Sequence, residues 1–127
     1  MASLNKRLKY LNLIKIRLPI TGVVSFAHRV SGLLMFLAIP FLIYLLQLSS
    51  ASPDGYQLTL EYLSHPLVKL VTLVLLWSVS HHLLAGIRFL LIDVDIGVEK
   101  PVARMSAGTV LFLSITLSLL FVVLVLL

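Results

Sequence analysis

The sequence contains no cysteine among its 127 residues and only five acidic side chains. Without cysteine, the chain alone cannot build a disulfide framework, a zinc–thiolate site or an iron–sulfur cluster. Charged residues make up 12% of the sequence, whereas a typical soluble domain carries about 25%. The chain therefore lacks the polar surface that a folded domain of this size needs in water.

Apolar residues replace the missing charges. They form 60% of the sequence, and the mean hydropathy is +1.10. They gather in three long stretches, at about residues 21–48, 66–92 and 109–127. A helix needs about 20 mostly apolar residues to cross the hydrocarbon core of a bilayer. The sequence thus predicts an all-α integral membrane protein with three transmembrane helices, forming a single membrane-anchor domain over residues 1–127.

The connectors between the three stretches are polar. Ser49–Ser64 contains Ser-Pro-Asp-Gly at residues 52–55, a combination that favours a turn. Asp93–Gly108 contains Pro101, which we expect to break any helix there.

The basic residues are distributed unevenly along the chain. Six of the ten lysines and arginines lie in Lys6–Arg29, and Arg88, Lys100 and Arg104 lie at or after the end of the second stretch. Only Lys69 borders the first connector. The positive-inside rule then places the N-terminus and the second connector on the cytoplasmic side, or the matrix side in a mitochondrion. Because the basic residues flank apolar segments, the net charge of +5 indicates a lipid bilayer and no nucleic-acid partner.

The first stretch carries a polar stripe. Ser25, His28, Arg29 and Gly32 are spaced i, i+3, i+4 and i+7, so they share one helix face. Ionisable residues inside a span are costly, and they usually face a protein interior, a cavity or a ligand. The simpler alternatives are a histidine that hydrogen-bonds a neighbouring helix and an arginine that anchors the helix at the membrane surface.

The second stretch carries a similar stripe. Ser78, His82, Gly86 and Phe89 share a face, and Gly86 would let a flat ligand or another helix approach the imidazole. At 1.5 Å per residue, His82 lies roughly 16 Å below the inner surface and His28 roughly 10 Å. We therefore expect both stripes in the inner half of the bilayer, facing one buried cofactor from different depths.

A b-type haem fits these residue types. Its iron takes an axial histidine, its macrocycle is apolar, and its propionates need cationic partners near the polar edge. Arg29 and Arg88 are candidates for the propionates, although anchoring at the surface explains Arg88 at least as well. Two histidines of this chain could in principle ligate the iron together. Three helices enclose a haem poorly, so we expect a partner subunit.

Two motifs resemble those of one family, the cytochrome b subunits of succinate dehydrogenase (respiratory complex II). The first motif is RLPITGVVSFAHRVSG at Arg17–Gly32. It resembles the family pattern of Arg-x-Pro followed by Ser-x-x-His-Arg-x-Ser-Gly. The second is His-x-x-x-Gly-Ile-Arg…Asp, which resembles HLLAGIRFLLID at His82–Asp93. This sequence departs from the pattern in two places, because His81 directly precedes His82 and Ile92 stands where an aromatic residue or methionine is more typical.

The resemblance implies a site. His82 would be the axial ligand of the haem iron, Ser25 and Arg29 would line a quinone-binding site, and His28 and Arg29 would lie near a haem propionate. The haem b would be shared with a second small membrane anchor subunit, and the quinone would be ubiquinone or menaquinone.

The resemblance also implies an assembly. The chain would be part of a hetero-oligomeric helix bundle that anchors a flavoprotein subunit and an iron–sulfur subunit. The expected location is a bacterial inner (cytoplasmic) membrane, in preference to the mitochondrial inner membrane, with the N-terminus cytoplasmic. The chain alone would not oxidise succinate, because it has no flavin-binding fold. Two alternatives stay open: a fumarate reductase-type or other b-type cytochrome anchor, and a structural anchor with no cofactor.

Overall fold

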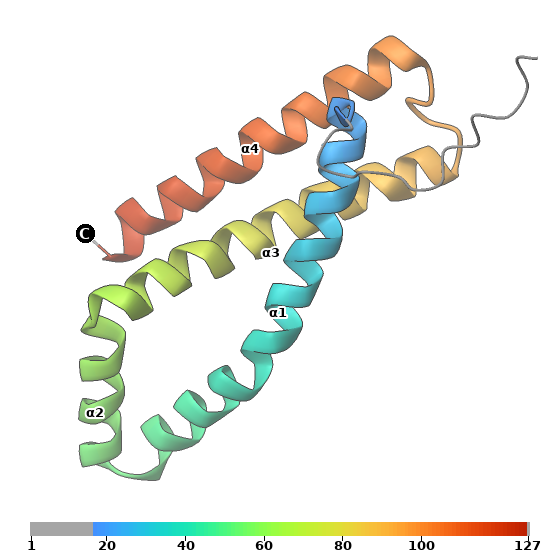
Figure 1. The fold of residues 1–127 in the computed structure, drawn as a ribbon. Helices are drawn as coiled ribbons and strands as arrows, with labels where there is room; N and C mark the ends of the chain where they lie inside the picture. The colour runs from blue at the N-terminus through green and yellow to red at the C-terminus, as the bar shows by residue number, and fades with distance from the viewer. Residues whose placement is uncertain (1–16, 127) are drawn as a thin grey trace, which may run out of the picture.

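The computed structural model describes residues 17–126, which form four helices (Figure 1). These helices are α1 (Ile20–Ala51), α2 (Pro53–Ser64), α3 (Pro66–Asp93) and α4 (Lys100–Leu126). No strand occurs within residues 17–126. Helices α1, α3 and α4 are long and apolar enough to cross a membrane. The prediction of an all-α membrane protein with three transmembrane helices is confirmed.

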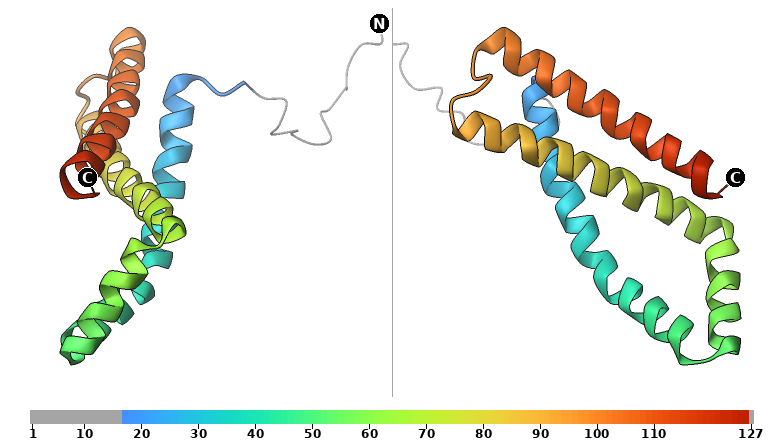
Figure 2. Two further views of the ribbon diagram at one scale, coloured as in Figure 1. Left: turned by 90° about the vertical axis from the view of Figure 1, so that its left-hand side faces the viewer. Right: turned by 180° about the vertical axis from the view of Figure 1, so that it is seen from behind.

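Helix α3 is the central element of the bundle. Helix α4 runs back beside α3, whereas α1 crosses α3 and then diverges from it toward α2 (Figures 1 and 2). A small core forms where the three long helices meet, from Val24, Ala85, Ala107 and Val110. Many of the larger apolar side chains elsewhere on the helices are exposed. Such side chains are available to lipid or to partner helices.

The connection between α1 and α2 is a single residue, Ser52. Its hydroxyl oxygen accepts a hydrogen bond from the Gly55 amide at 3.0 Å, which caps α2. Pro53 is the first helical residue, where its missing N–H has no partner to lose. A Cβ at Gly55 would collide with the Leu48 carbonyl oxygen, so glycine lets α2 begin close against the end of α1. The predicted turn is therefore confined to Ser52, and most of the predicted connector is helical.

The expectation that Pro101 breaks any helix in this connector was wrong. Helix α4 begins at Lys100, so Pro101 lies in its first turn, where an N–H is not needed. The helix therefore starts nine residues before the apolar stretch that begins at about Thr109.

The remaining connector between α3 and α4 is short because α3 ends abruptly. Asp95 has a left-handed conformation with φ of 62°. Its amide donates to the Ile92 carbonyl at 3.0 Å, and the Ile96 amide donates to the Leu91 carbonyl at 2.9 Å. This is the hydrogen-bond pattern of a Schellman helix end. It brings the start of α4 close to the last turns of α3.

The two ends of the bundle differ in charge. The starts of α1 and α4 lie at one end and α2 lies at the other (Figure 2, left). Basic residues on or near the first end are Arg17, Arg29, Arg88, Lys100 and Arg104, whereas Lys69 follows α2. The basic residues Lys6–Lys15 lie outside the described residues.

Candidate functional site

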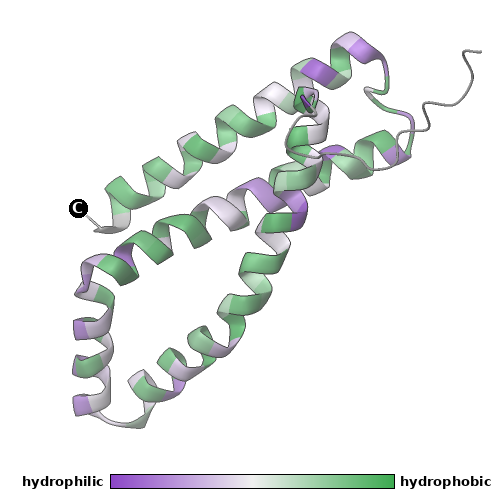
Figure 3. Cartoon of the chain, viewed as in Figure 1, coloured by the Kyte–Doolittle hydropathy of each residue, from purple (hydrophilic) through white to green (hydrophobic). Residues whose placement is uncertain are grey.

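Hydrophilic segments of α1 and α3 lie side by side where the two helices cross (Figure 3). The imidazole rings of His28 and His82 stack there, with centroids 3.9 Å apart and planes inclined by 13°. The Phe89 ring meets the His28 ring edge-on at 5.2 Å. The structure thus brings together residues from both stripes that the sequence predicts.

Direct stacking corrects the estimate that His28 and His82 lie at different depths. Counting residues separated the two rings by about 6 Å along the bilayer normal. That count treats both helices as perpendicular to the membrane and as starting at its surface. In the structure α1 and α3 cross at an angle (Figure 1), so the two histidines meet despite their unequal counts.

One nitrogen of the His82 ring is held by α1. Its Nδ1 lies 3.1 Å from the His28 carbonyl oxygen and 3.2 Å from the Ser31 hydroxyl oxygen. Ser31 is fully buried, and its hydroxyl donates to the same His28 carbonyl at 2.8 Å. The other ring nitrogen, Nε2, has no hydrogen bond to any residue in the range 17–126.

A glycine lies beside each of the two stacked histidine rings, and the two glycines differ in how much space a side chain would have. A Cβ on Gly32 would lie 3.0 Å from Cε1 of His82, which is too close for an ordinary contact. A Cβ on Gly86 would lie 3.6 Å from Nε2 of His28, which is an ordinary van der Waals distance. Gly32 is therefore the glycine that the position of the His82 ring requires. The partner that approaches Gly86 is His28, from another helix.

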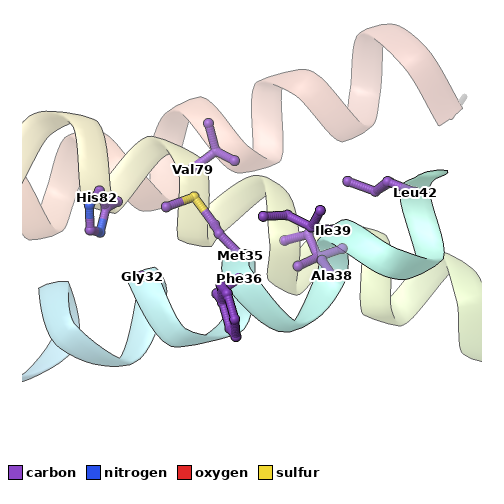
Figure 4. A pocket seen from close by; sticks show the side chains of 9 residues that line it. Gly32, Met35, Phe36, Ala38, Ile39, Leu42, Val79 and His82 are labelled. Atoms are coloured by element: carbon purple, nitrogen blue, oxygen red, sulfur yellow. The ribbon is translucent and has the colours of Figure 1, made fainter.

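An apolar groove runs between α1 and α3 from His82 (Figure 4). Its volume is about 460 Å³. The residues that line it are Gly32, Met35, Phe36, Ala38, Ile39 and Leu42 from α1, and Leu75, Val79 and His82 from α3. His82 is the one ionisable side chain in this lining. A flat apolar group entering the groove would therefore meet apolar side chains and one imidazole.

His81 points away from the groove. It is fully buried, its ring stacks on Trp77 at 5.2 Å, and its Nδ1 lies 3.3 Å from the Ser114 hydroxyl of α4. A ligand has no route to its ring in this arrangement. Within residues 17–126, no group of three or more histidine, aspartate or glutamate side chains could hold a metal ion. A haem iron, by contrast, requires only one imidazole from each side.

Ser25 and Arg29 lie one turn apart at the start of α1. Ser25 is half-buried and Arg29 is exposed. Neither side chain forms a hydrogen bond with another residue of the described range 17–126. His28, between them in sequence, is half-buried by its contacts with α3.

Sequence reasoning did not predict two contacts, one made by Arg88 and one made by Ser31. Arg88 is only 7% exposed; its Nε donates to the Ser106 hydroxyl and its Nη2 to the Ala103 carbonyl, both at 3.0 Å. It therefore joins α3 to α4 and is not a surface anchor. Ser31, next to Gly32 in the first motif, contacts His82 directly. Recognising α4 as helical from Lys100 would have indicated the role of Arg88.

Comparison with known proteins agrees with the two motifs. The chain is 36% identical over 110 residues to the succinate dehydrogenase cytochrome b556 subunit of Coxiella burnetii (strain RSA 493 / Nine Mile phase I). That match covers 86% of this chain and 88% of the Coxiella protein. The succinate dehydrogenase/fumarate reductase transmembrane subunit family matches residues 3–121. The chain therefore belongs to the family of succinate dehydrogenase/fumarate reductase transmembrane subunits.

Proposed function

We propose that this chain is a haem b-binding anchor subunit of succinate dehydrogenase, with His82 as the axial ligand through Nε2. One observation carries the proposal: His82 is held at Nδ1 by α1, while its Nε2 has no hydrogen bond within residues 17–126 and its ring borders an apolar groove. Histidines that ligate metals almost always donate their other ring N–H to a carbonyl, carboxylate or water. The name of the Coxiella relative, a cytochrome b556 subunit, supports the same function.

The residues around His82 fit a haem. The groove offers apolar walls for the macrocycle, and Arg29 is the exposed cation on the adjoining part of α1. His28 stacks on the His82 ring and would limit its rotation. When bound, the haem supplies a one-electron carrier. The protein holds the imidazole in place and excludes water from its apolar side.

A partner subunit would supply the second axial ligand. Two imidazoles would hold one haem iron only if each directed a ring nitrogen at it. His28 and His82 instead lie face to face at 3.9 Å, with no room for a haem between them. His81 is fully buried, with its Nδ1 beside the Ser114 hydroxyl of α4. We therefore assign one ligand to this chain and place the other in a second small anchor subunit.

The quinone site would form around Ser25 and Arg29. The Ser25 hydroxyl would donate a hydrogen bond to a quinone carbonyl, and Arg29 would stabilise the negative charge that develops on reduction. Electrons would pass from a flavoprotein subunit to the iron–sulfur subunit, and from there to the quinone. Ubiquinone and menaquinone both have the carbonyl oxygens that this pair of residues requires.

The orientation in a bacterial inner membrane follows from the charged end of the bundle. The end with Arg17, Lys100 and Arg104 would face the cytoplasm, and α2 would face the opposite side. Because the chain has no cysteine, Gln57→Cys and Glu99→Cys each introduce a single label site in this subunit. Both positions are exposed. We expect an impermeant thiol reagent to label Gln57→Cys from outside. Labelling of Glu99→Cys from outside would show that the chain has the opposite orientation.

An optical spectrum of the purified complex tests the haem. We expect the reduced-minus-oxidised spectrum to show a b-type haem band. A complete complex without this band would leave the chain as a cofactor-free anchor. The fumarate reductase-type alternative is tested separately, by comparing succinate oxidation by quinone with fumarate reduction by quinol in the same preparation.

An activity ratio tests the quinone site. Arg29→Ala should lower quinone reductase activity more than Ser25→Ala does, because a charge-assisted interaction is about twice as strong as a neutral hydrogen bond. Electron transfer from succinate to a soluble dye should persist in both variants, since a dye can bypass the membrane site. An unchanged ratio of quinone to dye activity in assembled Arg29→Ala complex would remove Arg29 from the site.

A further inference from the structure

The Ser31 hydroxyl has one proton, and the His28 carbonyl receives it. The Ser31 oxygen lies 2.8 Å from that carbonyl oxygen. With its proton used there, the hydroxyl can only accept a hydrogen bond from another group. Its oxygen is 3.2 Å from Nδ1 of His82.

The His28 carbonyl settles which partner is the donor. A carbonyl oxygen has no proton, and it lies 3.1 Å from the same Nδ1. If Nδ1 had a lone pair instead of a proton, it would face the lone pairs of this oxygen. Nδ1 must therefore carry the proton and share it between the two oxygens. The neutral ring then has its lone pair on Nε2.

We propose that Ser31 is a positioning residue that tunes the haem ligand His82, an inference that rests on the proposed function of His82. The hydroxyl and the His28 carbonyl together hold His82 in the tautomer whose Nε2 can bind iron. They also accept from Nδ1–H, which raises the basicity of Nε2. A more basic ligand favours the ferric state, so this contact lowers the haem midpoint potential.

The burial of Ser31 strengthens this role. Its side chain is fully enclosed between α1 and α3, so no solvent water competes for Nδ1–H. Gly32, the next residue, leaves the space that the His82 ring occupies. Ser31 and Gly32 thus act on the same imidazole, one through a hydrogen bond and one through the absence of a side chain.

The test is a redox titration of the haem absorbance in the purified, complete complex. Ser31→Ala should shift the midpoint potential to a more positive value and weaken haem retention about 10-fold or more, as for other partners of ligating histidines. Ser31→Thr keeps a hydroxyl that can donate to the same helical carbonyl and should restore both properties. If Ser31→Ala does not assemble, Ser31→Cys, which retains a weaker acceptor, should give a smaller positive shift.

Ser114→Ala is the matched control. Ser114 is also fully buried and is the hydroxyl partner of the neighbouring His81. Its loss should leave the haem potential unchanged. The proposal fails if Ser31→Ala keeps the wild-type potential, if Ser31→Thr shifts it equally, or if Ser114→Ala reproduces the shift. A wild-type haem spectrum in His82→Ala complex would instead overturn the proposed function, so the two failures are distinguishable.

Discussion

His81 and His82 are consecutive residues of α3, and the helix turns them toward different neighbours. One residue step rotates the side chain by about 100°. That rotation places His81 among α1, α3 and α4, in contact with Trp77 and Ser114. His82 instead turns toward α1, where its Nδ1 meets the Ser31 hydroxyl and the His28 carbonyl, and it borders the groove.

The difference shows what a ligand histidine needs besides an imidazole. Both rings have Nδ1 near a buried serine hydroxyl, at 3.3 Å for His81 and 3.2 Å for His82. The second nitrogen of His81 is enclosed without a partner within residues 17–126. The second nitrogen of His82 is not enclosed in this way, and its ring borders an apolar space. Access to Nε2, and not the hydrogen bond at Nδ1, therefore separates the two residues.

Replacing each histidine should give the largest contrast. We expect His82→Ala to abolish or strongly change the haem spectrum, because it removes the axial ligand. His81→Ala should keep the spectrum and lower the thermal stability of the complex, because it leaves a cavity in the core. Spectra of both purified variants, normalised to subunit content, make the comparison. Loss of haem in His81→Ala but not in His82→Ala would assign the ligand role to His81 instead of His82.

Replacing each of the two glycines with alanine should show which of the two stacked rings is sensitive to an added methyl group. Gly32→Ala places a Cβ 3.0 Å from His82 and should displace its ring, lowering haem content or shifting its spectrum. Gly86→Ala meets His28 at 3.6 Å and should be tolerated. Haem content per complex is the measurement. Equal effects of the two substitutions would mean that the ring positions differ from those described.

Arg88 tests whether a buried cation serves the haem or the bundle. Its hydrogen bonds to Ser106 and Ala103 are charge-assisted, and each such bond contributes about 1.5–3 kcal/mol. Arg88→Ala should therefore lower the unfolding temperature of the complex in detergent and leave the haem spectrum intact. A changed spectrum with an unchanged unfolding temperature would assign Arg88 to the haem.

Ser114→Ala should have the smallest effect. It removes the hydroxyl beside Nδ1 of His81, a hydrogen bond worth about 1 kcal/mol. We expect a slightly lower unfolding temperature with normal haem content and normal quinone reductase activity. A loss of haem here would mean that the surroundings of His81 matter to the cofactor.

The residues that the sequence predicted and those that it missed differ in a physical way. The three spans follow from hydropathy. Two helical stripes predict that His28 and His82 both face the interior, but not that their rings stack. Ser31 and Arg88 act through contacts 51 and 18 residues away along the chain. Such contacts depend on how the helices cross. The early start of α4 was missed because a proline is compatible both with the first turn of a helix and with the point where a helix ends. Pro101 alone does not distinguish these two positions.

The most direct test of the central claim is chemical rescue by imidazole. His82→Gly complex, supplied with haem, should regain the low-spin wild-type spectrum when imidazole is added, because the free ligand can enter the space beside the groove. His81→Gly complex should show that spectrum without any addition. A His82→Gly complex with the wild-type spectrum before imidazole is added would contradict the assignment of His82 as the ligand.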